Sequence, residues 1–118
     1  MAHHNDTGVK GEEMARVYLE QQGFTILHQN WRHSHWEVDI IASKSGKLHF
    51  IEVKTRRSKT FGFPEESVSK KKLTNLIEAA EEFTILFPEW KLLQFDILSI
   101  IIIKDTAPEF LYIEDIYL

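Results

Sequence analysis

The chain has 118 residues, a formal net charge of −4 and no cysteine. This length fits one domain with its own core, so we expect a single domain over residues 1–118, and the polar amino terminus and short apolar runs predict neither a signal peptide nor a membrane span. The missing cysteines exclude disulfides and thiolate zinc sites and fit a cytoplasmic protein, while the negative charge disfavours a protein that simply coats nucleic acid.

Residues 8–22 predict the first helix, which Gly23 is expected to end. Its apolar positions recur at helical spacing: Met14, Ala15, Tyr18 and Leu19. Glu13 falls on the opposite, solvent-facing side, whereas Glu12 falls at the margin of the apolar stripe. A carboxylate in the first turn can simply complement the helix dipole. That role suits Glu13, while Glu12 is left open between this role and a part in a functional site.

Residues 24–28 predict a strand, and a short polar stretch follows it. His33 and His35 have a spacing compatible with metal ligands. Because no further histidine, cysteine or carboxylate is in register with them, we expect a loop or edge position instead.

Two further strand-like segments, residues 37–41 and 50–56, are joined by a turn-like link and predict a hairpin. The first carries Asp39, and the second ends in Glu52 and Lys54. Residues two apart in a strand point to the same face, so Glu52 and Lys54 lie side by side, and the pairing brings Asp39 near them. Two carboxylates and an amine at one end of a small sheet predict a site for a divalent metal and a water molecule.

A basic segment, residues 54–59, leaves this strand directly, which favours a phosphate contact over a merely solvated loop. Residues 65–87 predict a second helix that Pro88 ends. Lys72 flanks its apolar face, where it either solvates the helix or reaches a phosphate. The apolar face consists of Leu73, Leu76, Ile77, Ala80, Phe83 and Phe87.

Residues 91–103 predict a strand whose second half is apolar on both faces, so it is either central in the sheet or covered by another subunit. Residues 109–118 return as a last strand. The order is therefore helix, three strands, helix, then one or two strands. Both helices have one apolar face, which predicts an α/β fold with the sheet between the helices.

Several motifs resemble the YraN family of small bacterial proteins that are predicted to be endonucleases. That family is similar to the restriction-endonuclease-like PD-(D/E)xK superfamily, near the archaeal Holliday-junction resolvases. The resemblance implies an αβββαβ core with a mixed central sheet flanked by helices, and an added carboxy-terminal strand. The motifs are Gly11-Glu12, Gly23-Phe24, Asn30-Trp31-Arg32, Glu37-Val38-Asp39-Ile40-Ile41, Phe50-Ile51-Glu52-Val53-Lys54-Thr55-Arg56, Phe61-Gly62 and Val68…Lys72…Ala80.

The resemblance also implies roles for individual residues. The catalytic set would be Asp39, Glu52 and Lys54, with Glu12 as the glutamate of the first helix. Asp39, Glu52 and the Val53 carbonyl would hold one or two Mg²⁺ or Mn²⁺ ions. The nucleic-acid contacts would come from Arg56, Lys59 and Lys72. Three positions depart from the family pattern: Trp36 replaces the usual glycine, Val38 replaces the proline of the motif, and Gln94 replaces a frequent arginine.

The leading hypothesis is a metal-dependent endonuclease that acts on DNA, including branched or processed structures, and that is a possible homodimer. Lys54 is expected to orient the attacking water, because two adjacent carboxylates would raise its pKa and disfavour a general-base role. One alternative is a nucleic-acid-binding module with little or no cleavage activity. Another is an interaction protein whose isoleucine-rich strand dimerises and whose acidic cluster only pairs with lysines.

Overall fold

The computed structural model describes residues 6–57 and 70–116. Its elements follow the predicted order, with two strands after the second helix. They are α1 (Asp6–Gln21), β1 (Thr25–His33), β2 (Trp36–Lys44), β3 (Lys47–Arg56), α2 (Lys70–Leu86), β4 (Leu93–Ile101) and β5 (Glu109–Ile113). The strands form one sheet in the order β1-β2-β3-β4-β5. Only β3 and β4 run parallel, joined through α2, so the protein has an α/β fold with a mixed five-stranded sheet.

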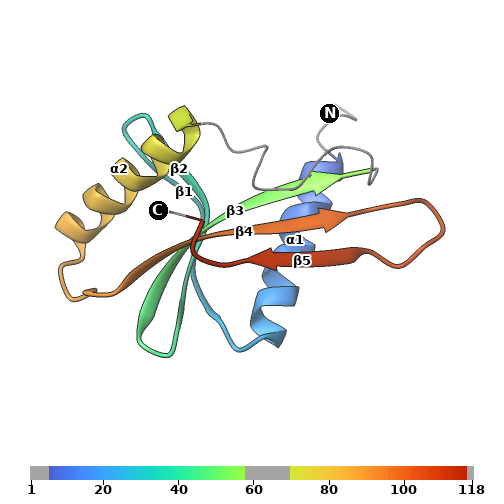
Figure 1. Cartoon of the computed structure of the whole chain (residues 1–118), viewed down its shortest axis with the longest axis horizontal. Coiled ribbons are helices and arrows are strands. Elements are labelled where there is room, and N and C mark those ends of the chain that lie inside the picture. The colour runs from blue at the N-terminus through green and yellow to red at the C-terminus, as the bar shows by residue number, and fades with distance from the viewer. Residues whose placement is uncertain (1–5, 58–69, 117–118) are drawn as a thin grey trace.

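The two helices pack on opposite faces of the sheet, as the apolar patterns predicted. Figure 1 shows α2 beside β2 and α1 behind β3, β4 and β5. Neighbouring residues of a strand point to opposite faces, so Phe50 packs under α2 while Ile51 packs under α1. The α2 side of the core is built from Val38, Ile41, Leu48, Phe50, Leu76, Ala79, Ala80, Phe83 and Phe95. The α1 side is built from Ala15, Leu19, Phe24, Ile40, Ala42, Ile51, Leu98 and Ile100.

Turn residues set the helix end and the hairpin register. Gly23 has a φ of 96°, and the Phe24 N–H donates to the Leu19 carbonyl at 3.0 Å, which is the hydrogen bond of a Schellman cap. Ser45 and Gly46 both have positive φ, at 52° and 78°. This is the backbone pattern of a two-residue hairpin turn between antiparallel strands, so the predicted β2–β3 hairpin is confirmed.

Two strand ends, those of β1 and β5, differ clearly from the sequence prediction. β1 extends to His33, beyond the predicted residues 24–28, because it pairs with β2 as far as the Ser34–His35 turn. His33 therefore ends an edge strand and His35 lies in the turn, in agreement with the expected loop or edge position. β5 ends at Ile113 and not at residue 118: Asp115 has a φ of 54°, and its N–H donates to the Asp96 side chain. The predicted start of α2 at residue 65 lies outside the described residues.

β4 is an internal strand, which settles how its apolar run is covered. It pairs with β3 on one side and β5 on the other, and its residues 94–100 are buried. The first alternative, a central strand, is therefore confirmed, and its burial needs no second subunit. In the described part of the chain, no helix is long and apolar enough to cross a membrane.

Candidate active site

Asp39 lies where β2 and β3 separate. The two strands pair from the hairpin turn as far as Ile40 and Ile51. Immediately beyond that pair, the Val53 N–H donates to Asp39 Oδ2 at 2.8 Å, so the carboxylate is held across the gap between the strands. Asp39 and Glu52 line one cavity of about 170 Å³. The structure thus brings these two predicted site residues together.

Two lysines reach the carboxylate of Glu52, which is 11% exposed. Lys72, from α2, places its Nζ 2.5 Å from Glu52 Oε2. Lys54, from the same strand as Glu52, places its Nζ 3.7 Å from the same oxygen. The closest cation at this carboxylate therefore comes from the second helix and not from the strand motif.

Negative charge is crowded around Asp39. Burial raises the pKa of Asp39 to about 6, and the neighbouring Glu52 carboxylate adds to that rise. The Val53 N–H and Lys72 act in the opposite direction and lower this pKa, while Glu12 adds a small further rise. A carboxylate whose charged form is disfavoured in this way gains from any cation placed beside it.

The pKa of Lys54 is lowered, which contradicts the sequence expectation. Burial is the main cause, and the hydrogen bond and positive charge of Lys72 lower the pKa further. Glu52 and Asp39 raise it, as expected, but their effect is smaller. The expectation failed because it counted the two carboxylates and omitted both burial and the second lysine. Although burial lowers the pKa of Lys72, its hydrogen bond to Glu52 raises it above the usual value.

Glu12 approaches the site from α1 through Asn30. The Asn30 side chain donates to Glu12 Oε2 at 3.2 Å, and Asn30 faces Asp39 across the β1–β2 pairing. Asn30 has a φ of 51°, in the left-handed region where asparagine is enriched. Within the described ranges, no three histidine or acidic side chains come close enough to hold a metal ion directly. Glu12 therefore acts on Asp39 at longer range.

Helix α1 can bring Glu12 this close because Gly11 has no side chain. A Cβ atom built on Gly11 would lie 2.2 Å from Thr55 Oγ1 of β3. Real Cβ atoms do not approach another heavy atom so closely, so only glycine fits without a shift of the helix. The buried contact of Gly11 with β3 fixes the position of the next residue, Glu12.

Of the two other predicted nucleic-acid contacts, the structure describes one. Arg56 is the last residue of β3 and shares the strand parity of Glu52 and Lys54. Lys59 lies outside the described residues. The sequence analysis missed the contact of Asn30 with Glu12. It named Asn30 only as part of the motif Asn30-Trp31-Arg32 and gave it no role. It also missed that His35 of the β1–β2 turn and Asn75 of α2 line the cavity of Asp39 and Glu52.

Comparison with known sequences places these residues in a family. Residues 11–100 match the family described as "Uncharacterised protein family UPF0102". A UPF0102 protein of Bacteroides thetaiotaomicron is 43% identical over 101 residues, covering 86% of this chain and 84% of the relative. One from Parabacteroides distasonis is 39% identical over 117 residues, covering 99% and 96%. The chain belongs to the UPF0102 family, in agreement with the YraN-like resemblance of its motifs.

Proposed function

We propose that this protein is a metal-dependent endonuclease that hydrolyses phosphodiester bonds in DNA, on a restriction-endonuclease-like fold. One observation carries the proposal: Asp39 and Glu52 line a single cavity where β2 and β3 separate, with two lysines within reach of Glu52. Phosphodiester hydrolysis needs hard oxygen ligands for a cation, and positive groups that stabilise charge on the phosphate. The cavity offers both kinds of group.

The donor set fits a hard divalent cation such as Mg²⁺ or Mn²⁺. The carboxylates of Asp39 and Glu52 and the carbonyl of Val53 would hold one, leaving positions for water and phosphate. The raised pKa of Asp39 supports this assignment, since the crowded carboxylates gain from a positive charge between them. Glu12 would act through a bridging water or at a second ion. When bound, the cation supplies charge that offsets the developing phosphorane charge and lowers the pKa of its water.

The lysines carry the remaining chemistry. Lys54 orients the attacking water, and its lowered pKa also suits it to take a proton from that water. With Glu52 held by a cation, Lys72 would be available to contact a phosphate oxygen. Arg56 at the end of β3 would extend the phosphate contacts, and the family resemblance adds Lys59, so binding is independent of sequence and weakened by salt.

A second function is favoured by one contact. Lys72 already neutralises Glu52 at 2.5 Å, which is the arrangement of an acidic group that pairs with lysines and holds no metal. The corresponding protein would bind nucleic acid on the same surface with little or no cleavage. Metal binding and turnover separate this binding module from the endonuclease.

The decisive experiment is a cleavage panel of single-stranded, duplex, flap and four-way DNA with Mg²⁺ or Mn²⁺. Asp39→Asn and Lys54→Ala should each lower the rate at least about 100-fold, the scale of removing one transition-state contact. Asp105→Asn, in the β4–β5 turn, is the matched control and should cleave normally. Equal activity in wild type, Asp39→Asn and Lys54→Ala would refute this site. Binding without cleavage by the wild type would favour the binding module.

A matched pair of variants tests the role of Glu12. Glu12→Gln should slow cleavage, whereas Glu13→Gln should leave the rate unchanged, because Glu13 is exposed and paired with Arg16 at 2.9 Å. Both changes remove one negative charge from the same turn of α1. Equal effects of the two variants would assign Glu12 to the helix end and not to the site.

A further inference from the structure

A second and larger cavity, about 390 Å³, opens on the α1 side of the sheet. His49 lies in its wall, three residues before Glu52 in β3. Residues three apart in a strand point to opposite faces and lie about 10 Å apart, so this cavity is separate from that of Asp39 and Glu52. Its volume falls within the range of small-molecule sites.

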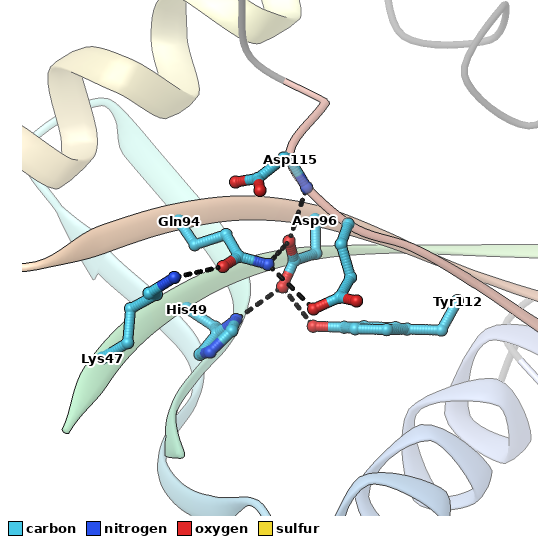
Figure 2. Close-up of polar contacts among 7 residues, drawn as sticks. Lys47, His49, Gln94, Asp96, Tyr112 and Asp115 are labelled. Atoms are coloured by element: carbon cyan, nitrogen blue, oxygen red, sulfur yellow. Dashed lines mark hydrogen bonds and ion pairs between the residues drawn. The ribbon is translucent and has the colours of Figure 1, made fainter. Parts of the chain in front are cut away.

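A buried polar network fixes the wall of this cavity (Figure 2). Asp96 is fully buried at its centre. His49 Nδ1 lies 2.7 Å from Asp96 Oδ2, and the Tyr112 hydroxyl donates to the same oxygen. Gln94 donates to the other Asp96 oxygen at 2.9 Å. Because Asp96 accepts the Nδ1 proton, the second ring nitrogen of His49, Nε2, is turned away from the network.

His49 Nε2 is a polar atom without a protein partner on a side chain that is mostly buried. The side chain of His49 is only 6% exposed, and within residues 6–57 and 70–116 its one hydrogen bond is that to Asp96. Every fully buried side-chain nitrogen or oxygen of these residues has a partner, so Nε2 is open to the cavity that His49 lines. It presents a lone pair to an N–H or O–H group of a ligand when the ring is neutral.

The inner and outer ends of the cavity differ in chemistry. The buried Phe24 ring lies edge-on to the His49 ring, with 4.9 Å between the two ring centroids. It gives the inner end of the cavity an aromatic wall. The hairpin turn places Lys44 and Lys47 at the outer end, while Glu114 is the acidic residue there. Lys47 donates to Gln94 at 3.1 Å, and Lys44 lies 5.0 Å from the Phe24 ring centroid. Two lysines against one glutamate leave the rim positive.

We propose that this cavity binds a nucleotide unit, with its base at the inner end and its phosphate at the lysines of the hairpin turn. A nucleobase is planar, stacks on aromatic rings and carries N–H groups for an acceptor such as His49 Nε2. A phosphate suits the ammonium groups of Lys44 and Lys47. The unit is either a free nucleoside monophosphate or the phosphorylated end of a strand. The proposal stands without the hydrolytic activity assigned to the other cavity.

The test is a titration of the full chain with AMP, GMP, CMP or UMP in phosphate-free buffer, followed by amide chemical shifts. Binding should shift the signals of Tyr18, His49 and Gln94 more than those of Asp39 and Glu52. Adenosine and inorganic phosphate alone should each bind at least about tenfold more weakly than AMP, since each makes only part of the contacts. A 5′-phosphorylated oligonucleotide identifies the source: tighter binding than the mononucleotide assigns a strand end, and equal or weaker binding a free nucleotide.

Variants of the rim exclude an effect on folding. Lys44→Ala/Lys47→Ala should weaken nucleotide binding at least about tenfold, while Lys104→Ala, in the β4–β5 turn, should bind normally. Gln22→Trp, an exposed position at the mouth of the cavity, should block entry without touching the core. No binding of any of the four nucleotides at millimolar concentration would overturn the proposal. So would shifts confined to Asp39 and Glu52, or affinity that neither rim variant changes.

Discussion

Lys72 Nζ lies 2.5 Å from Glu52 Oε2, closer than Lys54 Nζ, which lies 3.7 Å from the same oxygen. The two lysines come from different elements, α2 and β3, and therefore tie the second helix to the strand that carries the acidic motif. Any cation that binds Glu52 must compete with Lys72.

Lys72→Ala should destabilise the metal-free protein by about 1 kcal/mol, because Glu52 is largely buried and would retain only the more distant Lys54. Added Mg²⁺ should then raise the melting temperature more in this variant than in the wild type, since the nearer of the two ammonium groups no longer competes for the carboxylate. Thermal unfolding with EDTA and with Mg²⁺ measures both effects. Lys71→Ala, an exposed neighbour on α2, is the control. A Mg²⁺ response that is the same in all three proteins would contradict the competition.

Asp39→Asn should stabilise the metal-free protein at neutral pH by about 1 kcal/mol or more. The change removes a charge that burial and Glu52 disfavour, while an amide oxygen at the same position still accepts from the Val53 N–H. Loss of function with gain of stability is the usual behaviour of a charged functional group. Chemical denaturation of Asp39→Asn beside the exposed Asp105→Asn tests this. Asp39→Asn unfolding more easily than the wild type would show that the carboxylate is structurally required.

Gly11→Ala should destabilise the protein by about 1–3 kcal/mol, the usual range for overpacking a core contact. Its Cβ would lie 2.2 Å from Thr55 Oγ1, so either the Thr55 side chain must shift or α1 must move away from β3 together with Glu12. Thr55→Ala removes the obstructing oxygen, and the double variant should therefore recover much of the lost stability. Denaturant unfolding of the wild type, the two single variants and the double variant measures the coupling between the two changes. Strict additivity of the two changes would exclude the contact as the cause.

The sequence predicted the elements well and the electrostatics of the site poorly. The β2–β3 hairpin and the end of α1 follow from local rules, since Gly46 and Gly23 have the positive φ angles that such turns require. The approach of Asp39 to Glu52 follows from the register of that hairpin. The pKa of Lys54 does not follow from local rules, because it depends on burial and on Lys72 from another element.

Asn30 shows a second limit of the sequence. Its role depends on a left-handed backbone inside β1 and on contact with Glu12, 18 residues away. Neither the strand pattern nor the helix pattern contains that information. The β1 boundary was missed for a similar reason: its length is set by pairing with β2 and not by its own apolar residues, because most of its side chains are exposed or half-buried.

The buried Asp96 predicts a dependence of stability on pH. Although burial alone would raise the pKa of Asp96, hydrogen bonds from His49, Tyr112, Gln94 and the Asp115 N–H lower it below the usual value of 3.8. A carboxyl group whose pKa is lower in the folded than in the unfolded state stabilises the fold above the unfolded pKa. That contribution is lost as pH falls through the folded pKa.

Asp96→Asn should therefore destabilise the protein at pH 7 by about 3–5 kcal/mol, the usual cost of breaking a buried, hydrogen-bonded charge. The difference from the wild type should shrink below about pH 4, as Asp96 itself becomes protonated. Unfolding free energies across this range measure the difference, and subtraction cancels the carboxyl groups that both proteins share. Asp105→Asn should show no such dependence, because Asp105 is exposed. A difference that grows below about pH 4 would mean that the pKa of Asp96 is raised and that its hydrogen bonds fail to offset its burial.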